Sequence, residues 1–223
     1  LQLMSTGSKY KFFIPQDLAY GPAQKGEVIK PFSVLVFEVD LLEVKGVKCS
    51  SIASGIKKNN ALDLSLFSFI EGTKTAAVFT QNIFCAAPVM VAKNHLNSNI
   101  QALLINSGNA NAGTGQKGLE NAYKTCEILA QKLKIKPEQI LPFSTGVIGE
   151  ELPLEPFENN SDILIQSLSD SSISDVARGI MTTDLVEKYC STTFDIDGSN
   201  VTLCGVAKGS GMIAPNLATM LSF

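Results

Sequence analysis

The sequence predicts a mixed α/β fold in two parts, and three observations lead to this prediction. Short apolar runs typical of buried strands occur on either side of a segment with helical periodicity near residues 119–135. Apolar side chains make up 45% of the 223 residues and charged side chains 17%, which suits a globular core. The composition also changes near Lys45–Gly46, so we expect two parts, residues 1–45 and residues 46–223.

The first part predicts a fragment of β-sheet. KYKFFIP (9–15) and FSVLVFEVDLLEV (32–44) are rich in aromatic and β-branched residues, which is typical of strands. A loop rich in turn-forming residues joins them. Two strands and a loop bury too little apolar surface to form an independent core.

The second part predicts strands and helices in a mixed order. Four apolar runs have the length of buried strands: AAVFT (76–80), APVMVA (87–92), QALLIN (101–106) and ILPFS (140–144). An amphipathic helix is predicted to end near Ile135, before Pro137, because apolar residues recur at spacings of three and four at Leu119, Ala122, Cys126, Leu129, Ala130 and Leu133. We expect a further helix over 174–182 and a hairpin over 191–209 that turns at Asp197–Gly198.

Charge and cysteine content argue against several classes of partner. The net charge is −3, and no basic stripe with interleaved aromatic residues suggests nucleic-acid binding. No apolar run approaches the ~20 residues of a membrane span, and the first residues lack a signal-peptide pattern. The five cysteines are widely spaced, without a C-x-x-C pair. We therefore expect a cytoplasmic protein with no disulfide framework, metal or cofactor.

His95 is the sole histidine of the sequence. It stands in the polar stretch KNHLNSN (93–99), and we interpret it as a solvated loop residue. A nucleophile in this protein would then need a base other than imidazole.

Two glycine-rich patterns are open to more than one interpretation. GTGQKG (113–118) fits G-x-G-x-x-G, but a dinucleotide site is disfavoured because seven residues separate Ile105 from Gly113, where the fingerprint needs a tight turn. INSGNANAGTG (105–115) is rich in asparagine and glycine. It predicts either an elaborate turn or a loop that lines a polar pocket.

Three polar segments contain candidate site residues. Thr145 and Gly146 follow a predicted strand, where backbone N–H groups could face a developing oxyanion or form an ordinary turn. IMTTD (180–184) sets two hydroxyls and a carboxylate at the end of a predicted helix, where capping is the alternative. Lys208 precedes two glycines and could meet a substrate carboxylate or remain solvated.

Residues 1–45 resemble the C-terminal half of FKBP-type peptidyl-prolyl isomerases. The A-Y-G turn, an isoleucine and the V-F-x-V-x-L-L strand recur in the same spacing. In that family, the residues matching Tyr20, Ile29 and Phe37 line the proline pocket. The other pocket residues belong to the absent N-terminal half, so we expect a sheet fragment and not a working isomerase.

A second resemblance covers about residues 46–223. Its motifs occur in the order seen in the ornithine acetyltransferase family, also called bifunctional glutamate N-acetyltransferase or ArgJ: GIKKN, AAVFT, CAAPVMVAKNHL, LLINSGNANAGTG, STGVIGE, ARGIMTTD and VAKGSGMIAPNLATML. The resemblance implies a layered fold of the N-terminal-nucleophile type. It also implies that this sequence is the α chain, incomplete without a β chain.

The family chemistry implies a role for Thr219. A precursor cleaves itself at the bond matching Ala218–Thr219, and the new N-terminal threonine is the nucleophile. Its α-amine, with a pKa of about 8, can act as the base. An acetyl group then passes from N-acetylornithine through Thr219 to glutamate, in arginine biosynthesis. The resemblance assigns Thr145 and Gly146 to the oxyanion hole, and Thr182 and Lys208, with Thr219, to substrate binding.

The resemblance also implies partners for this protein, and three alternative functions stay open. It implies an α2β2 assembly with the β chain, and acetyl-CoA as a further acetyl donor in some members. MTTDLVEKYC (181–190) departs from the family's T-F/H-P-K run, so we expect the substrate-side loop to differ. We expect the sequence as it stands to be inactive, because it stops just past the cleavage site. The rivals are a proline isomerase, a non-catalytic binding module that uses the NSGNANA loop, and a related aminopeptidase.

Overall fold

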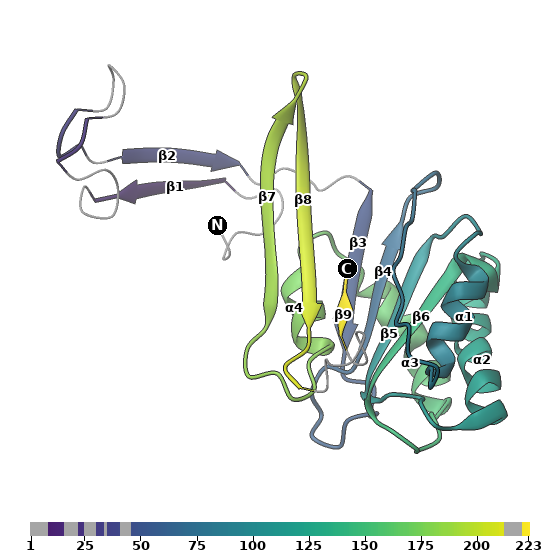
Figure 1. Cartoon of the computed structure of the whole chain (residues 1–223). Coiled ribbons are helices and arrows are strands. Elements are labelled where there is room, and N and C mark those ends of the chain that lie inside the picture. Colours follow the sequence, from purple (N-terminus) through teal and green to yellow (C-terminus); the bar gives the residue numbers. More distant parts are fainter. Residues whose placement is uncertain (1–8, 16–21, 25–29, 34, 41–45, 212–219) are drawn as a thin grey trace. The chain divides into compact units, whose positions relative to one another are not determined.

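The computed structural model describes residues 9–15, 22–24, 30–33, 35–40, 46–211 and 220–223 (Figure 1). By its internal contacts the chain divides into two compact units, Leu1–Lys45 and Gly46–Phe223, and each is described by itself.

The first unit contains an antiparallel strand pair. Strand β1 (Lys9–Ile14) pairs with β2 (Leu35–Asp40), and the register runs from Lys9 opposite Asp40 to Ile14 opposite Leu35. Both predicted strands are therefore confirmed over residues that the structure describes. Of the residues matched to the proline pocket, Phe37 lies in β2 opposite Phe12. Tyr20 and Ile29 lie outside the described residues.

The second unit is built on a four-stranded sheet in the order β3-β4-β5-β6. Strands β3 (Val47–Ile52), β4 (Leu64–Phe69) and β5 (Ala102–Asn109) pair antiparallel, whereas β5 and β6 (Ile140–Val147) run parallel. A parallel pair needs a crossover connection, and helix α2 (Gly115–Leu133) provides it. The strands predicted at 101–106 and 140–144 and the amphipathic helix are thus confirmed.

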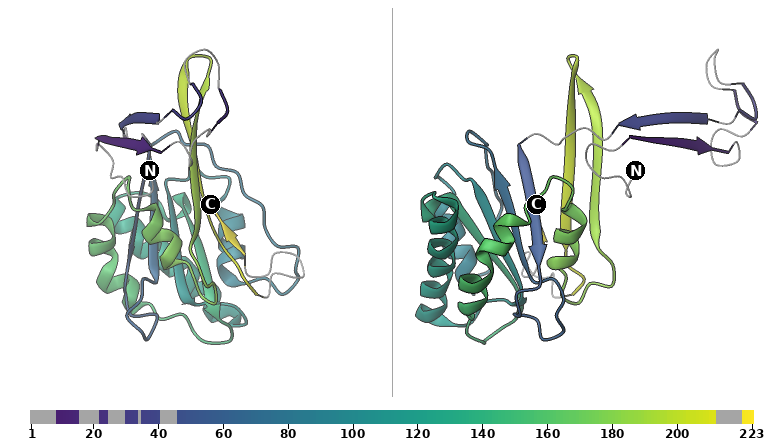
Figure 2. Two further views of the ribbon diagram at one scale, coloured as in Figure 1. Left: turned by 90° about the vertical axis from the view of Figure 1, so that its left-hand side faces the viewer. Right: turned by 180° about the vertical axis from the view of Figure 1, so that it is seen from behind.

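Packed layers cover both faces of this sheet. Leu66 and Leu104 on one face pack with α1 (Ala87–His95), α2 and α3 (Glu155–Gln166), and Figure 2 shows α2 and α3 side by side. Phe67 and Leu103 on the other face pack with α4 (Ile173–Gly179) and with Val206 of the second sheet. Because strand residues alternate between faces, each strand contributes to both cores. The predicted layered α/β fold is confirmed.

A second sheet has the order β7-β8-β9. Strands β7 (Lys188–Ile196) and β8 (Ser199–Lys208) form a hairpin, and β9 (Leu221–Ser222) pairs with the end of β8. The turn lies at Asp197–Gly198, as predicted, with φ of +51° and +79°. One face of the hairpin is apolar and exposed, with Phe194 opposite Val201, while Thr193 and Thr202 hydrogen-bond on the other face.

Two predicted strands are wrong. Residues 76–80 form no regular element, and Val78 is 87% exposed. Residues 87–92 belong to α1, where Pro88 occupies the first turn of the helix. A short apolar run does not distinguish a buried strand from a buried helix, which explains the second error. Strands β3 and β4 and helix α3 are not among the elements predicted from the sequence.

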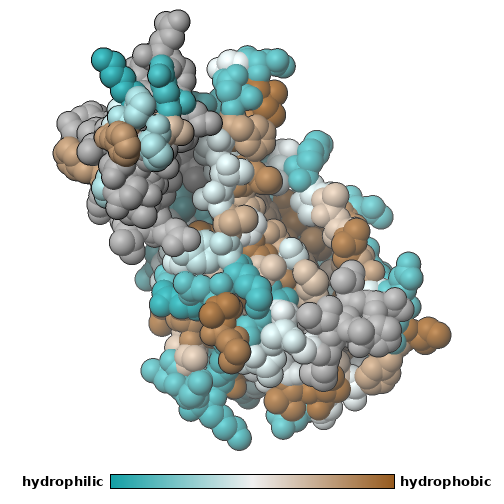
Figure 3. Space-filling model, turned by 60° about the vertical axis from the view of Figure 1, so that its left-hand side comes forward, coloured by the Kyte–Doolittle hydropathy of each residue, from teal (hydrophilic) through white to brown (hydrophobic). Residues whose placement is uncertain are grey.

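Hydrophobic and hydrophilic side chains are mixed on the face that Figure 3 shows. Large apolar residues exposed on the second unit include Ile83, Phe84, Leu185 and Val186. Within the described ranges, no helix is long and apolar enough to cross a membrane, and no cluster of His, Cys, Asp and Glu could hold a metal ion.

Candidate active site

The end of strand β6 brings Thr145 and Gly146 beside β5. In the parallel register, Thr145 lies opposite Ser107 and Gly146 opposite Gly108, and the pairing becomes irregular at Asn109. Gly146 has φ of +140°, and a Cβ built on it would lie 2.3 Å from the carbonyl carbon of Gly108. The two backbones approach too closely for any side chain, so this position requires glycine.

Lys208, at the end of β8, joins three segments of the chain. Its ammonium donates to the Thr182 hydroxyl at 2.7 Å and to the Thr145 hydroxyl at 3.1 Å. Lys208 is 3% exposed and Thr145 is 4% exposed. The structure therefore brings together candidate residues from three separate sequence motifs, with Gly146 next to one of them.

The carboxylate of Asp184 binds several members of this cluster. One carboxylate oxygen accepts from the Lys188 ammonium at 2.6 Å and from the Gly209 amide at 2.8 Å. The other faces the Thr182 amide at 3.4 Å and the Lys208 ammonium at 3.8 Å. The carboxylate side chain is fully buried. A buried charge needs partners of this kind, so Asp184 holds the Lys208–Gly209 turn against the Thr182 segment.

The ionisation of this cluster follows from burial and pairing. Burial alone would raise the pKa of Asp184, but the Lys188 ammonium, the Gly209 and Thr182 amides and the Lys208 charge outweigh it and lower the pKa to about 2. Burial lowers the pKa of Lys208, the Asp184 charge opposes this, and Lys188 adds to the lowering.

Lys57 supports the same site from a loop after β3. Its ammonium donates to the carbonyl oxygens of Leu62 at 2.8 Å, Met181 at 2.8 Å and Gly179 at 3.3 Å. Burial lowers the pKa of Lys57, and the Asp63 charge opposes this while the Lys208 charge adds to it. Lys57 lies in the motif GIKKN and Asp184 in ARGIMTTD, but the resemblance assigns neither residue a role. Two of their partners, Met181 for Lys57 and Gly209 for Asp184, are distant in sequence, and no local pattern indicates them.

The asparagine-rich loop is stabilised by its own side chains. Asn106 donates to the Asn109 carbonyl, Asn109 to the Glu150 and Glu151 carbonyls, and Asn111 to the Gly118 carbonyl. The Asn106 side-chain oxygen accepts from the Ser144 hydroxyl at 2.5 Å. These bonds are those of an elaborate turn, which was one of the two alternatives.

His95 is not a solvated loop residue, so that interpretation is wrong. It is the last residue of α1, it is 4% exposed, and its Nδ1 lies 2.8 Å from the Ile140 carbonyl oxygen. The ring also lies against Tyr123 of α2. Helix packing buries the residue despite its polar sequence neighbours. Ile140 begins β6 whereas Thr145 lies near its end, so the imidazole is placed away from the cluster.

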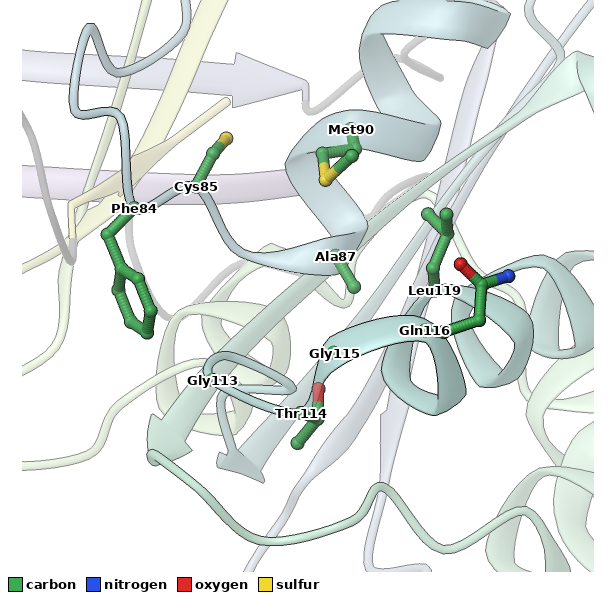
Figure 4. A pocket seen from close by; sticks show the side chains of 9 residues that line it. All are labelled: Phe84, Cys85, Ala87, Met90, Gly113, Thr114, Gly115, Gln116 and Leu119. Atoms are coloured by element: carbon green, nitrogen blue, oxygen red, sulfur yellow. The ribbon is translucent and has the colours of Figure 1, made fainter.

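Residues 113–116 of the glycine-rich segment line a surface pocket of about 300 Å³ beside α1 (Figure 4). The pocket is bounded by Phe84, Cys85, Ala87, Met90, Gly113, Thr114, Gly115, Gln116 and Leu119. Five residues separate the end of β5 at Asn109 from the start of α2 at Gly115. This connection is longer than a dinucleotide turn, which agrees with the sequence-based argument.

Ala218 and Thr219, the predicted cleavage site, lie outside the described residues. Strand β9 begins two residues after Thr219, and its first residue, Leu221, pairs with Lys208. Phe223 packs against Phe67 and Phe143 of the main sheet. The chain after the predicted cleavage site is thus anchored beside the cluster.

Comparisons with known proteins support one family for most of the chain. A model of the ArgJ family matches residues 48–223, and a model of FKBP-type peptidyl-prolyl cis-trans isomerases matches residues 1–42. The arginine biosynthesis bifunctional protein ArgJ of Pseudomonas syringae pv. tomato is 45% identical over 180 residues, which are 81% of this chain and 44% of that protein. Its counterpart from Methylococcus capsulatus is 45% identical over 186 residues, 83% of this chain and 46% of that protein.

Two solved structures share the fold. The Bacillus halodurans ArgJ structure has a TM-score of 0.72 and 36% identity, over 79% of this chain and 92% of that chain. The Mycobacterium tuberculosis ornithine acetyltransferase, solved with ornithine, has a TM-score of 0.72 and 33% identity, over 78% of this chain and 93% of that chain.

The chain spans less than half the length of the curated relatives that it matches. The ArgJ match, in contrast, covers more than half of the chain itself, and the relatives are well above 30% identical. On these grounds, the chain belongs to the ArgJ family.

Proposed function

We propose that this chain contributes the oxyanion-binding and substrate-side residues of a glutamate N-acetyltransferase that uses N-acetylornithine as acetyl donor, in arginine biosynthesis. The observation that carries the proposal is the contact of the buried Lys208 ammonium with the hydroxyls of Thr145, which is buried, and Thr182, which is exposed, in a chain of the ArgJ family. The relative from M. tuberculosis, an ornithine acetyltransferase solved with ornithine, supports the substrate class.

The proposed nucleophile is Thr219, after cleavage of the Ala218–Thr219 bond. The Thr219 hydroxyl attacks the Ala218 carbonyl carbon, the C–N bond breaks, and the resulting ester is hydrolysed by water. This leaves a carboxylate on Ala218 and a free α-amine on Thr219. That amine, with a pKa of about 8, takes the hydroxyl proton in the next attack.

Acetyl transfer then takes place in two half-reactions. The Thr219 oxygen attacks the acetyl carbonyl of N-acetylornithine, and the proton held by the α-amine passes to the departing ornithine nitrogen. The amine of glutamate attacks the acetyl-threonine ester, which gives N-acetylglutamate and restores the hydroxyl. Both steps pass through a tetrahedral oxyanion, for which Thr145 and Gly146 supply the donors. One such donor is typically worth about 2.7–4 kcal/mol.

The finer assignments belong to the same proposal. Thr182 and Lys208 lie on the substrate side of the site, and residues 46–223 act as an α chain with a β chain in an α2β2 assembly. We place the protein in the cytoplasm, with acetyl-CoA as a further candidate donor. Residues 1–45 form an FKBP-like fragment without isomerase activity.

The decisive experiment uses a version of the protein that spans the full length of its relatives. On a denaturing gel, the wild type should separate into two fragments whose junction, by mass spectrometry, is Ala218–Thr219. Thr219→Ala should remain intact, whereas the matched variant Ser222→Ala, at an exposed position three residues away, should cleave normally.

A second readout tests the acyl carrier. Incubation of the cleaved protein with N-acetylornithine should add one acetyl group to Thr219, and glutamate should remove it. An intact wild type that still transfers acetyl groups would contradict the threonine mechanism. Ornithine binding without any acetyl adduct would indicate a binding module, and proline isomerisation by this chain would indicate the isomerase alternative.

A further inference from the structure

The ammonium of Lys208 determines the hydrogen-bonding roles of two threonine hydroxyls. An ammonium group donates three hydrogen bonds and accepts none, whereas a hydroxyl donates one and accepts two. The oxygens of Thr145 and Thr182 must therefore be the acceptors in their contacts with Lys208, at 3.1 Å and 2.7 Å. Each threonine keeps its own proton for another acceptor. Over the described ranges, neither hydroxyl has a second hydrogen-bond partner.

The same contacts use most of the donor capacity of the ammonium. Two of its protons face the threonines, and the third side faces Asp184, whose Oδ2 lies 3.8 Å away. The lysine is also buried among the described residues. A substrate carboxylate would have to displace one of these partners to reach the Lys208 ammonium. This geometry therefore does not favour a role for Lys208 as a carboxylate ligand.

Asp184 holds Lys208 in this position through the backbone on either side of the Lys208–Thr182 contact. Its carboxylate binds the amide of Gly209, the residue after Lys208, and also faces the amide of Thr182. The aspartate therefore connects both ends of the Lys208–Thr182 contact. Its negative charge offsets the cost of burying the ammonium.

We propose that Lys208 is a positioning residue for Thr145. Its ammonium occupies an acceptor site of the Thr145 oxygen, so that the Thr145 hydroxyl proton is directed at the oxyanion of the tetrahedral intermediate, and Asp184 holds Lys208 in place. This inference rests on the proposed acetyl transfer and assigns Lys208 a step within it. A donor fixed in advance does not have to reorient as the negative charge develops, and a cation behind the hydroxyl polarises it.

The two possible roles of Lys208 predict different kinetics. A carboxylate ligand binds substrate and transition state alike, so its loss raises KM. A residue that orients an oxyanion donor acts in the transition state, so its loss lowers kcat. The orienting role also requires that Lys208 and Thr145 act as a unit, and removal of both should cost no more than removal of one.

The test is a double-mutant cycle in the full-length protein, assayed with N-acetylornithine and glutamate. Lys208→Met and Thr145→Val should each lower kcat by about 10²-fold, with KM for N-acetylornithine within about threefold of wild type. The double variant should stay within about threefold of the worse single variant. Thr145→Ser, which keeps the hydroxyl, should recover most of the kcat, and Lys74→Met, at an exposed position, should behave as wild type.

Two outcomes would overturn the proposal: a KM raised tenfold or more by Lys208→Met with kcat preserved, or losses that multiply in the double variant. Thermal unfolding verifies that each variant folds, and Lys208→Leu, which also removes the ammonium, replaces Lys208→Met in the cycle if the latter does not fold. A wild type that neither transfers nor carries an acetyl group would instead refute the proposed function.

Discussion

The ammonium nitrogen of Lys57 lies 2.8 Å from the carbonyl oxygen of Met181, a contact between residues 124 positions apart in the sequence. Met181 immediately precedes Thr182, so this contact holds the backbone that presents Thr182 to Lys208. The same ammonium also binds the carbonyls of Leu62 and Gly179. The loop after β3 and the segment after α4 are therefore connected through one cation.

Lys57→Met should destabilise the fold, because three carbonyl oxygens lose a charged donor together. Hydrogen bonds to charged groups contribute about 1.5–3 kcal/mol, and we expect a loss of the free energy of unfolding in this range by urea denaturation. The adjacent Lys58 is exposed, so Lys58→Met should change the stability by less than about 0.5 kcal/mol. Equal stabilities for the two variants would show that the Lys57 contacts contribute nothing.

Gly146→Ala should be strongly destabilising, because the new Cβ would lie 2.3 Å from the Gly108 carbonyl carbon. Gly149→Ala is a matched control, since Gly149 has φ of +84° but open space around the added Cβ. Backbone strain alone should cost the control about 1 kcal/mol, and the clash should add about 1–3 kcal/mol for Gly146→Ala. Similar midpoints of thermal unfolding for both variants would refute the close approach of β5 and β6.

Asp184 should make the fold sensitive to acid. Its pKa is about 2 in the folded protein and about 3.9 in an unfolded chain, so its stabilising contribution is present above pH ~4 and is lost as the pH falls toward 2. Asp184→Asn should lower stability at neutral pH and reduce the further loss between pH 4 and 2. Urea midpoints measured across this range test the prediction.

Asp162→Asn is the control for that experiment. Asp162 is a surface carboxylate paired with Lys132, and surface pairs of this kind contribute little to stability. The control should show the acid profile of the wild type. If Asp184→Asn also kept that profile, the buried carboxylate would not be ionised in the folded protein.

The five cysteines should divide into two groups toward thiol reagents. Burial raises the pKa of Cys49 and of Cys126 to about 12, so neither forms a reactive thiolate at pH 8. Cys190 and Cys204 are exposed and Cys85 is partly exposed. A chromogenic disulfide reagent should therefore label up to three thiols in the native protein and five after unfolding. Rapid labelling of all five without denaturant would contradict the packing of both cores.

The parts of the fold that could be predicted are those with a local signal. Helix α2 has a clear period of three and four residues, and the Asp197–Gly198 turn has the residue types that its left-handed backbone favours. Residues 76–80 and 87–92 are short apolar runs, and such runs suit a strand, a helix or an exposed loop equally well. Tertiary packing decided these cases, as it did for His95.

The candidate site shows the same limit. Thr145, Thr182 and Lys208 were named because their motifs resemble a family, while their mutual contacts depend on the fold. Asp184 and Lys57 received no role, because Gly209 and Met181 lie 25 and 124 residues away from them in the sequence. Partners at such separations leave no trace in the local pattern of a single sequence.

The hairpin of β7 and β8 has a consequence for the local dynamics of this unit. Its strands are exposed from Ser191 to Cys204, and only near Val206 does the ribbon enter the packed core. Amide protons near Asp197 should therefore exchange with deuterated solvent after small local openings, whereas the amide of Val206 should exchange far more slowly. Protection should rise along the ribbon toward Lys208, so that the candidate site lies at its slow-exchanging end.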